Sequence, residues 1–423
     1  MERNDKTYDQ FIQIMNEELR PAMGCTEPIA IAYAAAKARE VLGAKPEKLL
    51  IEVSGNIIKN VKSVVVPHTG GLRGIPAAAA AGAAAGDAEK ELEVISNVTG
   101  EGIAAMRDFL KAVPIEVKFA DTPHIFDIMI TASTGEESAY VRIVEYHTNI
   151  VCIKKNGETV FENETVEKAD GLTDRSVLSI ERIVEFGEIV DIEDVKELLE
   201  RQINYNMAIA EEGLKNNYGA NVGKTLLSQG DDIRMKLRAY AAAASDARMN
   251  GCEMPVVINS GSGNQGITTS VPIIVYARER GHSHEELLRA LTVANLVTTH
   301  LKTGIGRLSA YCGAVSAGCG MAAGLAFIRG GRFREIAHTV VNAVAMNSGV
   351  VCDGAKASCA AKIASAVEAG ILGLEMFEAG NQFFGGDGIV KKGVENTIAS
   401  VSRLAKLGMA ETDKEIIRLM LEE

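Results

Sequence analysis

Seven cysteines are the residues of this 423-residue chain whose type and spacing could support chemistry. Cys312 and Cys319 are seven residues apart, and so are Cys352 and Cys359. On one helix this spacing places two thiols about 10 Å apart, which is too far for them to share a zinc ion unless the glycines between them interrupt the helix. An iron–sulfur cluster takes thiolates from distant elements, and three ligands leave one iron open for chemistry. Small buried thiols that only fill space are the competing interpretation.

A polar, glycine-rich stretch at 259–270 is the second feature that could support chemistry. It follows an expected strand at 255–258 and precedes an expected helix at 271–276. Glycines let backbone N–H groups approach an anion, and polar side chains add oriented hydrogen bonds, so a carboxylate or phosphate could bind. The stretch matches neither the phosphate-binding loop nor the dinucleotide fingerprint, and an ordinary turn is the alternative. Its candidate binding residues are Ser260, Ser262, Asn264 and Gln265.

The elements that must position these residues follow from the spacing of apolar side chains. Strands are expected at 49–53 and 61–66, and further strands between 115 and 154 lead to a hairpin turn at Asn156-Gly157. After residue 191 the chain is mostly helical, with Ala/Gly-rich helices between 309 and 373 at the centre. Helices are also expected at 6–19, 29–41, 77–85, 102–112, 195–214, 233–248, 284–299 and 416–421.

We therefore predict an α+β fold with two domains. Residues 1–90 and 170–423 would form a mainly helical catalytic domain with Ala/Gly-rich central helices. Residues 91–169 would form an inserted α+β domain with a small antiparallel sheet. The chain has 41 Gly, no Trp and only 5% aromatic residues, so its core must pack through small side chains.

Charge and hydropathy exclude several classes of protein. There are 44 basic and 56 acidic side chains, a net charge of −12, which argues against binding to nucleic acid or to an anionic membrane. The N-terminal residues mix charges and do not resemble a signal peptide. The uncharged run 308–328 consists of small residues, which insert weakly into a bilayer. We expect a cytoplasmic protein with reduced thiols, and a homodimer because dimers are the commonest soluble oligomers.

Four motifs occur together in this chain: Gly24-Cys25-Thr26-Glu27-Pro28, Ser260-Gly261-Ser262-Gly263-Asn264-Gln265-Gly266, Tyr311-Cys312-Gly313-Ala314 and Cys352-Asp353-Gly354-Ala355-Lys356. As a set they resemble the L-cysteine desulfidase family, which is related to the α domain of the iron–sulfur L-serine dehydratases. The resemblance extends in order along essentially the whole chain. It implies an oxygen-labile [4Fe-4S] cluster in place of pyridoxal phosphate.

The resemblance also implies roles for individual cysteines. Cys312, Cys352 and Cys359 match the three positions expected to ligate the cluster, whereas Cys319 matches a position that is not expected to be a ligand. Cys25 matches a position tied to activity, either as a displaceable fourth ligand or as an acid–base thiol. The dehydratases carry a Ser/His-rich stretch at that loop, so a cysteine there favours the desulfidase side.

The activity that the resemblance implies is a carbon–sulfur lyase of cysteine catabolism, which converts an amino-acid substrate, L-cysteine, to pyruvate, ammonia and hydrogen sulfide. Such an elimination requires a base for the α-proton and a Lewis acid for the leaving sulfur. Cys25 or Glu27 is the candidate base, and Thr26 with the 260–266 loop would bind the carboxylate and ammonium. The alternatives are a dehydratase of serine or another β-substituted amino acid and, in another class, a non-catalytic iron–sulfur or sulfur-handling sensor.

Overall fold

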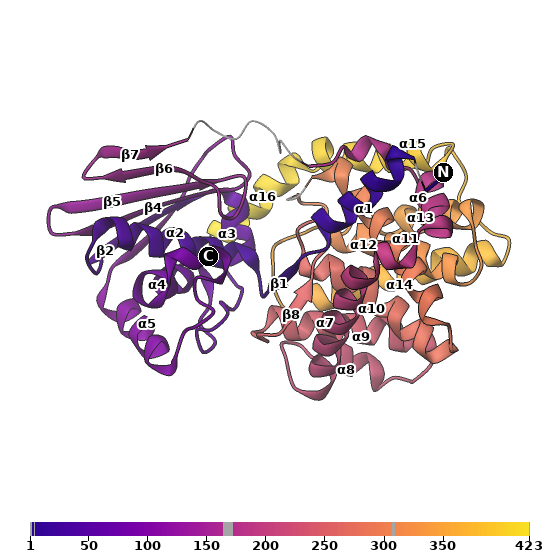
Figure 1. The fold of residues 1–423 in the computed structure, drawn as a ribbon, viewed down its shortest axis with the longest axis horizontal. Helices are drawn as coiled ribbons and strands as arrows, with labels where there is room; N and C mark the ends of the chain where they lie inside the picture. The colour runs from indigo at the N-terminus through magenta and orange to yellow at the C-terminus, as the bar shows by residue number, and fades with distance from the viewer. Residues whose placement is uncertain (1, 4, 164–171, 307–308, 423) are drawn as a thin grey trace.

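The computed structural model describes residues 2–3, 5–163, 172–306 and 309–422. These residues form two lobes, an α/β lobe built around one sheet and a larger helical lobe (Figure 1). The fold is mainly helical and α+β, as predicted. Among the described residues, no helix is both long and apolar enough to cross a membrane.

The α/β lobe holds a six-stranded sheet in the order β3-β2-β4-β5-β6-β7. Antiparallel pairing is confirmed from β4 to β7, whereas β3, also expected in the antiparallel sheet, pairs in parallel with β2. The elements of this lobe are α2 (Thr26–Leu42), β2 (Lys48–Val53), α3 (Gly55–Val61), α4 (Gly74–Ala85), α5 (Gly100–Ala112), β3 (Ile115–Phe119), β4 (Asp127–Thr134), β5 (Glu137–Val144), β6 (Ile150–Lys155) and β7 (Glu158–Glu162).

One face of the sheet and two Ala-rich helices form the core of this lobe. Ile128, Ile130 and Ala132 alternate along β4 and are fully buried, as the period of a strand requires. Helices α2 and α4 pack closely at Gly82, which has no side chain. A Cβ there would lie only 1.9 Å from the Ala32 carbonyl oxygen. That residues 91–169 form a separate inserted domain stays a prediction. The core of this lobe also includes three elements that precede residue 91, namely α2, β2 and α4.

The helical lobe surrounds α12, the most apolar helix, whose glycines allow neighbouring backbones to approach. The predicted Ala/Gly-rich centre is therefore confirmed. The elements of this lobe are α1 (Lys6–Glu18), β1 (Pro21–Met23), α6 (Ile180–Ile189), α7 (Lys196–Lys215), α8 (Val222–Leu227), α9 (Ile233–Met249), β8 (Pro255–Val257), α10 (Gly263–Arg280), α11 (His284–Ile305), α12 (Gly313–Ile328), α13 (Phe333–Asn347), α14 (Cys359–Glu378) and α15 (Val394–Arg403).

Helix α16 (Ala410–Leu421) extends from the helical lobe to α3 of the α/β lobe (Figure 1). The Nζ of Lys59, buried on α3, forms an ion pair with Asp413 of α16. Asn56 donates a second hydrogen bond to the same carboxylate at 3.1 Å. Ile417 packs on Gly55, where a Cβ would lie 2.4 Å from its Cδ1. Helix α16 therefore ties the two lobes together.

The strand expected at 61–66 is wrong. Helix α3 ends at Val61, and the residues that follow form a loop in which only Val65 makes a β-bridge, to Arg73. Val64, Val65 and Val66 are all buried, so this apolar run lacks the alternation that a half-buried strand shows. The helix expected at 271–276 begins earlier, at Gly263, so residues 263–270 of the 259–270 stretch are helical.

Candidate active site

A cavity of about 130 Å³ lies where the two lobes meet. The α/β lobe contributes the start of α2 and the end of α3, and the helical lobe contributes the ends of α9 and α11 and the starts of α10, α12 and α14. Most of the residues expected from the sequence line this cavity: Cys25, Thr26, Glu27, Ser262, Asn264, Gln265, Cys312, Cys352 and Cys359.

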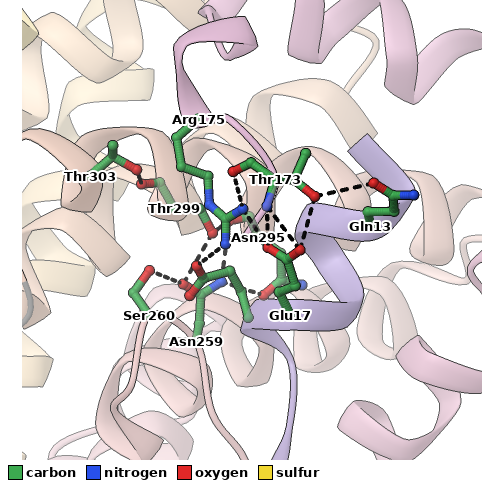
Figure 2. A network of polar contacts seen from close by, with 10 residues as sticks. Gln13, Glu17, Thr173, Arg175, Asn259, Ser260, Asn295, Thr299 and Thr303 are labelled. Carbon is green, nitrogen blue, oxygen red and sulfur yellow. Dashed lines mark hydrogen bonds and ion pairs between the residues drawn. The ribbon is translucent and has the colours of Figure 1, made fainter. Parts of the chain in front are cut away.

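Ser260 is the expected site residue that does not line the cavity. Its hydroxyl donates to Asn259 Oδ1 at 2.9 Å, and Asn259 Nδ2 in turn donates to Asn295 Oδ1 at 3.0 Å (Figure 2). Thr299 also donates to Asn259 Oδ1, at 3.4 Å. Ser260 therefore belongs to a buried polar network that holds the start of the 259–270 stretch against α11.

The Cys25 loop is held where the chain crosses between the lobes. Strand β1 pairs antiparallel with β8, with Met23 opposite Pro255. Gly24 follows with a φ of +60°, and a Cβ there would lie 2.5 Å from Pro67 Cγ, so both backbone and space require glycine. Helix α2 then begins at Thr26 with Cys25 as its N-cap.

Cys25 and Glu27 form a thiol–carboxylate pair inside the cavity. The Cys25 Sγ donates to Glu27 Oε2 at 2.9 Å, and Asn60 Nδ2 donates to Glu27 Oε1 at 3.3 Å. Burial and the neighbouring Glu27 charge raise the pKa of the Cys25 thiol well above its ordinary value. The pair therefore holds Cys25 as a protonated donor and Glu27 as the acceptor.

The three expected cluster cysteines come from two adjacent segments. Tyr311 and Val351 form an antiparallel bridge, and the backbone N–H of Cys312 donates to the Val350 carbonyl at 3.1 Å. Cys312 is therefore opposite Val350 and Cys352 is opposite Ala310, so the two cysteines lie diagonally across the bridge. Cys359 begins α14, and its thiol donates to the Gly354 carbonyl at 3.5 Å. Cys319 lies inside α12, fully buried and away from the cavity lining.

Four long helices begin at this cavity: α2, α10, α12 and α14, of 17, 18, 16 and 20 residues. Their N-caps are Cys25, Ser262, Cys312 and Ser358, and none makes a side-chain capping hydrogen bond. Each helix start carries the equivalent of roughly half a positive charge and leaves backbone N–H groups unpaired within the helix. The cavity is therefore suited to anionic groups such as thiolates and a carboxylate.

Arg248, at the end of α9, is a buried site residue that sequence reasoning missed. Its Nη2 donates to the Gly24 carbonyl at 2.7 Å and its Nη1 to Asn264 Oδ1 at 3.2 Å, so it joins the Cys25 loop to the 259–270 stretch. Its Nε is buried without a partner among the described residues. A Cβ at Gly263 would lie 2.3 Å from that Nε. Helix α9 carries other basic residues as well, so nothing in the sequence distinguishes Arg248 from an exposed side chain.

Two lysines add buried positive charge. Lys302 of α11 and Lys59 of α3 both line the cavity and are 5% and 2% exposed. Burial lowers the pKa of Lys302 to about 8. Lys59 follows a short apolar run, which gave no sign of a buried charge.

The residues present fit an iron–sulfur cluster. Three thiols, four helix starts and buried cations suit a group that binds thiolates and carries negative charge. Within the described ranges, no group of three or more His, Cys, Asp or Glu side chains is arranged to hold a metal ion. A single zinc ion requires all its sulfur ligands at about 2.3 Å. A four-iron cluster binds each thiolate at a different iron and tolerates ligands that lie farther apart.

Comparison with known proteins identifies the family. A sequence model of the serine dehydratase alpha chain matches residues 89–418. The chain belongs to the serine dehydratase alpha chain family. It is 59% identical over 425 residues to a UPF0597 protein of Desulfitobacterium hafniense (strain Y51), covering 100% of this chain and 99% of that protein. UPF0597 proteins of Lachnoclostridium phytofermentans and Treponema denticola are 51% identical over 415 residues (98% and 100% covered) and 47% identical over 431 residues (100% of each).

The match to the serine dehydratase alpha chain family covers only some of the residues that line the cavity. It includes Arg248, the 259–270 stretch and the three expected cluster cysteines, but it begins after Cys25, Glu27 and Lys59. The UPF0597 relatives, in contrast, align along the whole chain. The thiol–carboxylate pair is therefore supplied by the part of the chain that precedes the family match.

Proposed function

We propose that the chain is an L-cysteine desulfidase-like lyase that releases sulfide from L-cysteine and yields pyruvate and ammonia. The observation that supports this best is the thiol–carboxylate pair, Cys25 with Glu27, placed in one cavity with three further cysteines. Cys312, Cys352 and Cys359 would hold a [4Fe-4S] cluster. When bound, such a cluster supplies an iron with an open coordination position that acts as a Lewis acid toward the leaving sulfur.

Arg248 and the start of α10 bind the substrate carboxylate in this proposal. The guanidinium is buried, its Nε has no partner among the described residues, and it lies beside the uncapped N–H groups of α10, so both attract a carboxylate. Gln265 Oε1 is buried without a partner among the described residues and accepts from the substrate ammonium. A Cβ at Gly313 would lie 2.8 Å from Gln265 Cδ, so this glycine gives the side chain its place.

Glu27 removes the α-proton, because it is the hydrogen-bond acceptor of the pair. The Cα–H electron pair forms the Cα=Cβ bond as the Cβ–S bond breaks, and 2-aminoacrylate and hydrosulfide result. Cys25, which remains protonated, orients the carboxylate and supplies an acid within the same cavity for the departing sulfur. The aminoacrylate tautomerises to an imine, which water hydrolyses to pyruvate and ammonia.

An L-serine or other β-substituted amino-acid dehydratase is the second candidate, since the matching family is that of the serine dehydratase alpha chain. The two candidates share the carboxylate and ammonium contacts and differ in the leaving group. A thiol-bearing loop in place of a purely oxygen- and nitrogen-bearing one favours sulfur.

The test is anaerobic purification, reconstitution with iron and sulfide, and measurement of sulfide and pyruvate from L-cysteine and of pyruvate from L-serine. Equal release of sulfide and pyruvate, with a higher kcat/KM for L-cysteine, is expected. Cys312→Ala should lose cluster absorbance and activity, whereas Cys319→Ala, the buried cysteine outside the cavity, should keep both. Faster turnover of L-serine would establish the second candidate. A cluster-loaded protein that turns over neither substrate would indicate a sensor.

A further inference from the structure

Strand β3 is an exposed edge of the six-stranded sheet. It lies at one end of the strand order and pairs only with β2, in parallel, with Ile51 opposite Val117. Four of its five residues are exposed, and within the described ranges no strand covers its other edge. An exposed edge is a template for pairing with another chain unless the protein blocks it.

The hydrogen bonds that flank β3 show which of its backbone groups face outward. The Leu49 N–H donates to the Pro114 carbonyl at 3.0 Å, and the Ala120 N–H donates to the Val53 carbonyl at 2.9 Å. Even-numbered residues of β3 therefore face β2, because the bonding direction alternates along a strand. Ile115, Val117 and Phe119 direct their N–H and C=O groups away from the sheet.

The sequence of β3 is complementary to itself in the antiparallel direction. With Val117 opposite Val117 of a second copy, Ile115 faces Phe119 and Glu116 faces Lys118. The outward-facing residues then fall at hydrogen-bonded positions, and the opposite charges fall at the intervening closer positions. We propose that β3 pairs with β3 of a second copy of this chain and forms a continuous sheet across a two-fold axis.

The exposed side chains of β3 agree with this pairing. Val117 and Phe119 are 37% and 48% exposed and lie on the same face as the buried residues of β2, where the pairing covers them. Glu116 and Lys118 lie on the opposite face, 3.0 Å apart in one chain. The other edge strand is protected. Strand β7, fully exposed, places Glu158 opposite Glu162 when paired with itself, and like charges then repel.

Sedimentation velocity of the full-length chain tests the pairing, with the wild type, Glu116→Lys, Lys118→Glu and the double variant compared. The wild type should sediment as a dimer, twice the 45.0 kDa of one chain. Glu116→Lys and Lys118→Glu should each weaken dimerisation at least about tenfold, because like charges then face each other, and the double exchange should restore it. Val160→Lys on β7 is the matched control and should leave the dimer intact, and circular dichroism should show that every variant is folded.

A monomeric wild type at micromolar concentration would overturn the proposal. So would a dimer that both single exchanges leave unchanged, since its interface would lie elsewhere, or a dimer lost in Val160→Lys. Neither measurement depends on the lyase activity, so failure of this proposal and failure of the proposed function are separable.

Discussion

Replacement of Arg248 by Met removes the guanidinium and keeps most of the side-chain volume. The structure gives this group hydrogen bonds to the Gly24 carbonyl at 2.7 Å and to Asn264 Oδ1 at 3.2 Å, in a buried position. A hydrogen bond to a charged group contributes about 1.5–3 kcal/mol, and the substrate carboxylate would add one more. Loss of the substrate contact together with displacement of the loop costs about 3–6 kcal/mol, or roughly 10²–10⁴ in kcat/KM.

The assay is kcat/KM for sulfide release from L-cysteine, with iron content and absorbance near about 400 nm as the measure of cluster loading. L-cysteine methyl ester, which lacks the carboxylate charge, separates substrate binding from loop positioning. If Arg248 binds the carboxylate, the decrease caused by Arg248→Met should be at least about tenfold larger for L-cysteine than for the ester. Arg248→Lys, which keeps the charge but not the planar fork, should fall between wild type and Arg248→Met.

A glycine pair provides an independent test of the same contact. Gly263→Ala should reduce kcat/KM in the same direction, since its Cβ would lie 2.3 Å from Arg248 Nε. Gly100→Ala, at the start of α5, is the control because a Cβ there meets no atom within 4 Å. Wild-type kcat/KM in a cluster-loaded Arg248→Met protein would refute the assignment, and so would equal decreases with L-cysteine and its ester.

Three further outcomes are expected. In cluster-free protein, Glu27→Gln should lower the pH midpoint for alkylation of Cys25, followed by peptide mass spectrometry, because the Glu27 charge adds to burial in raising that pKa; an unchanged midpoint would contradict the pair. Asp413→Asn leaves the buried lysine of α3 without its carboxylate, so the free energy of unfolding in denaturant should fall by about 3–5 kcal/mol and hydrogen exchange in α3 and α16 should rise. Burial raises the pKa of Asp246 to about 6, above its unfolded value, so its ionisation costs stability as pH rises through about 4–6. The Tm of Asp246→Asn minus the Tm of the wild type should therefore be more positive at about pH 7 than at about pH 4. A difference in Tm that does not change with pH would contradict this prediction.

The sequence predicts those parts of the fold that have a clear period. Strand β4 alternates buried and half-buried residues along its middle. Helices α7 and α9 repeat apolar residues every three or four positions, so both were found close to their observed bounds. The loop after α3 has no such period, and a run of buried valines was therefore mistaken for a strand. Placement of β2 beside β3 and β4 depends on pairing between distant segments, which periodicity does not encode.

The candidate site shows the same division. Its cysteines and the Asn264–Gln265 segment stand out because thiols, amides and glycines occur in short motifs. Arg248 and Lys59 do not, because a single charge beside alanines or isoleucines looks like an exposed side chain until the packing shows that it is buried. The arginine contacts a carbonyl 224 residues away, so its role depends on tertiary structure alone.

The contacts that assemble the cavity also have a kinetic consequence. Arg248 reaches back 224 residues to Gly24, and Lys59 meets a carboxylate 354 residues further along the chain. Contacts of such large sequence separation close long loops, whose entropy must be lost before the contact repays it, and they slow folding. The helix pairs of the helical lobe, such as α11 with α12, are local and close short loops. During refolding, recovery of helical circular dichroism should therefore precede recovery of the cavity, and activity should return last.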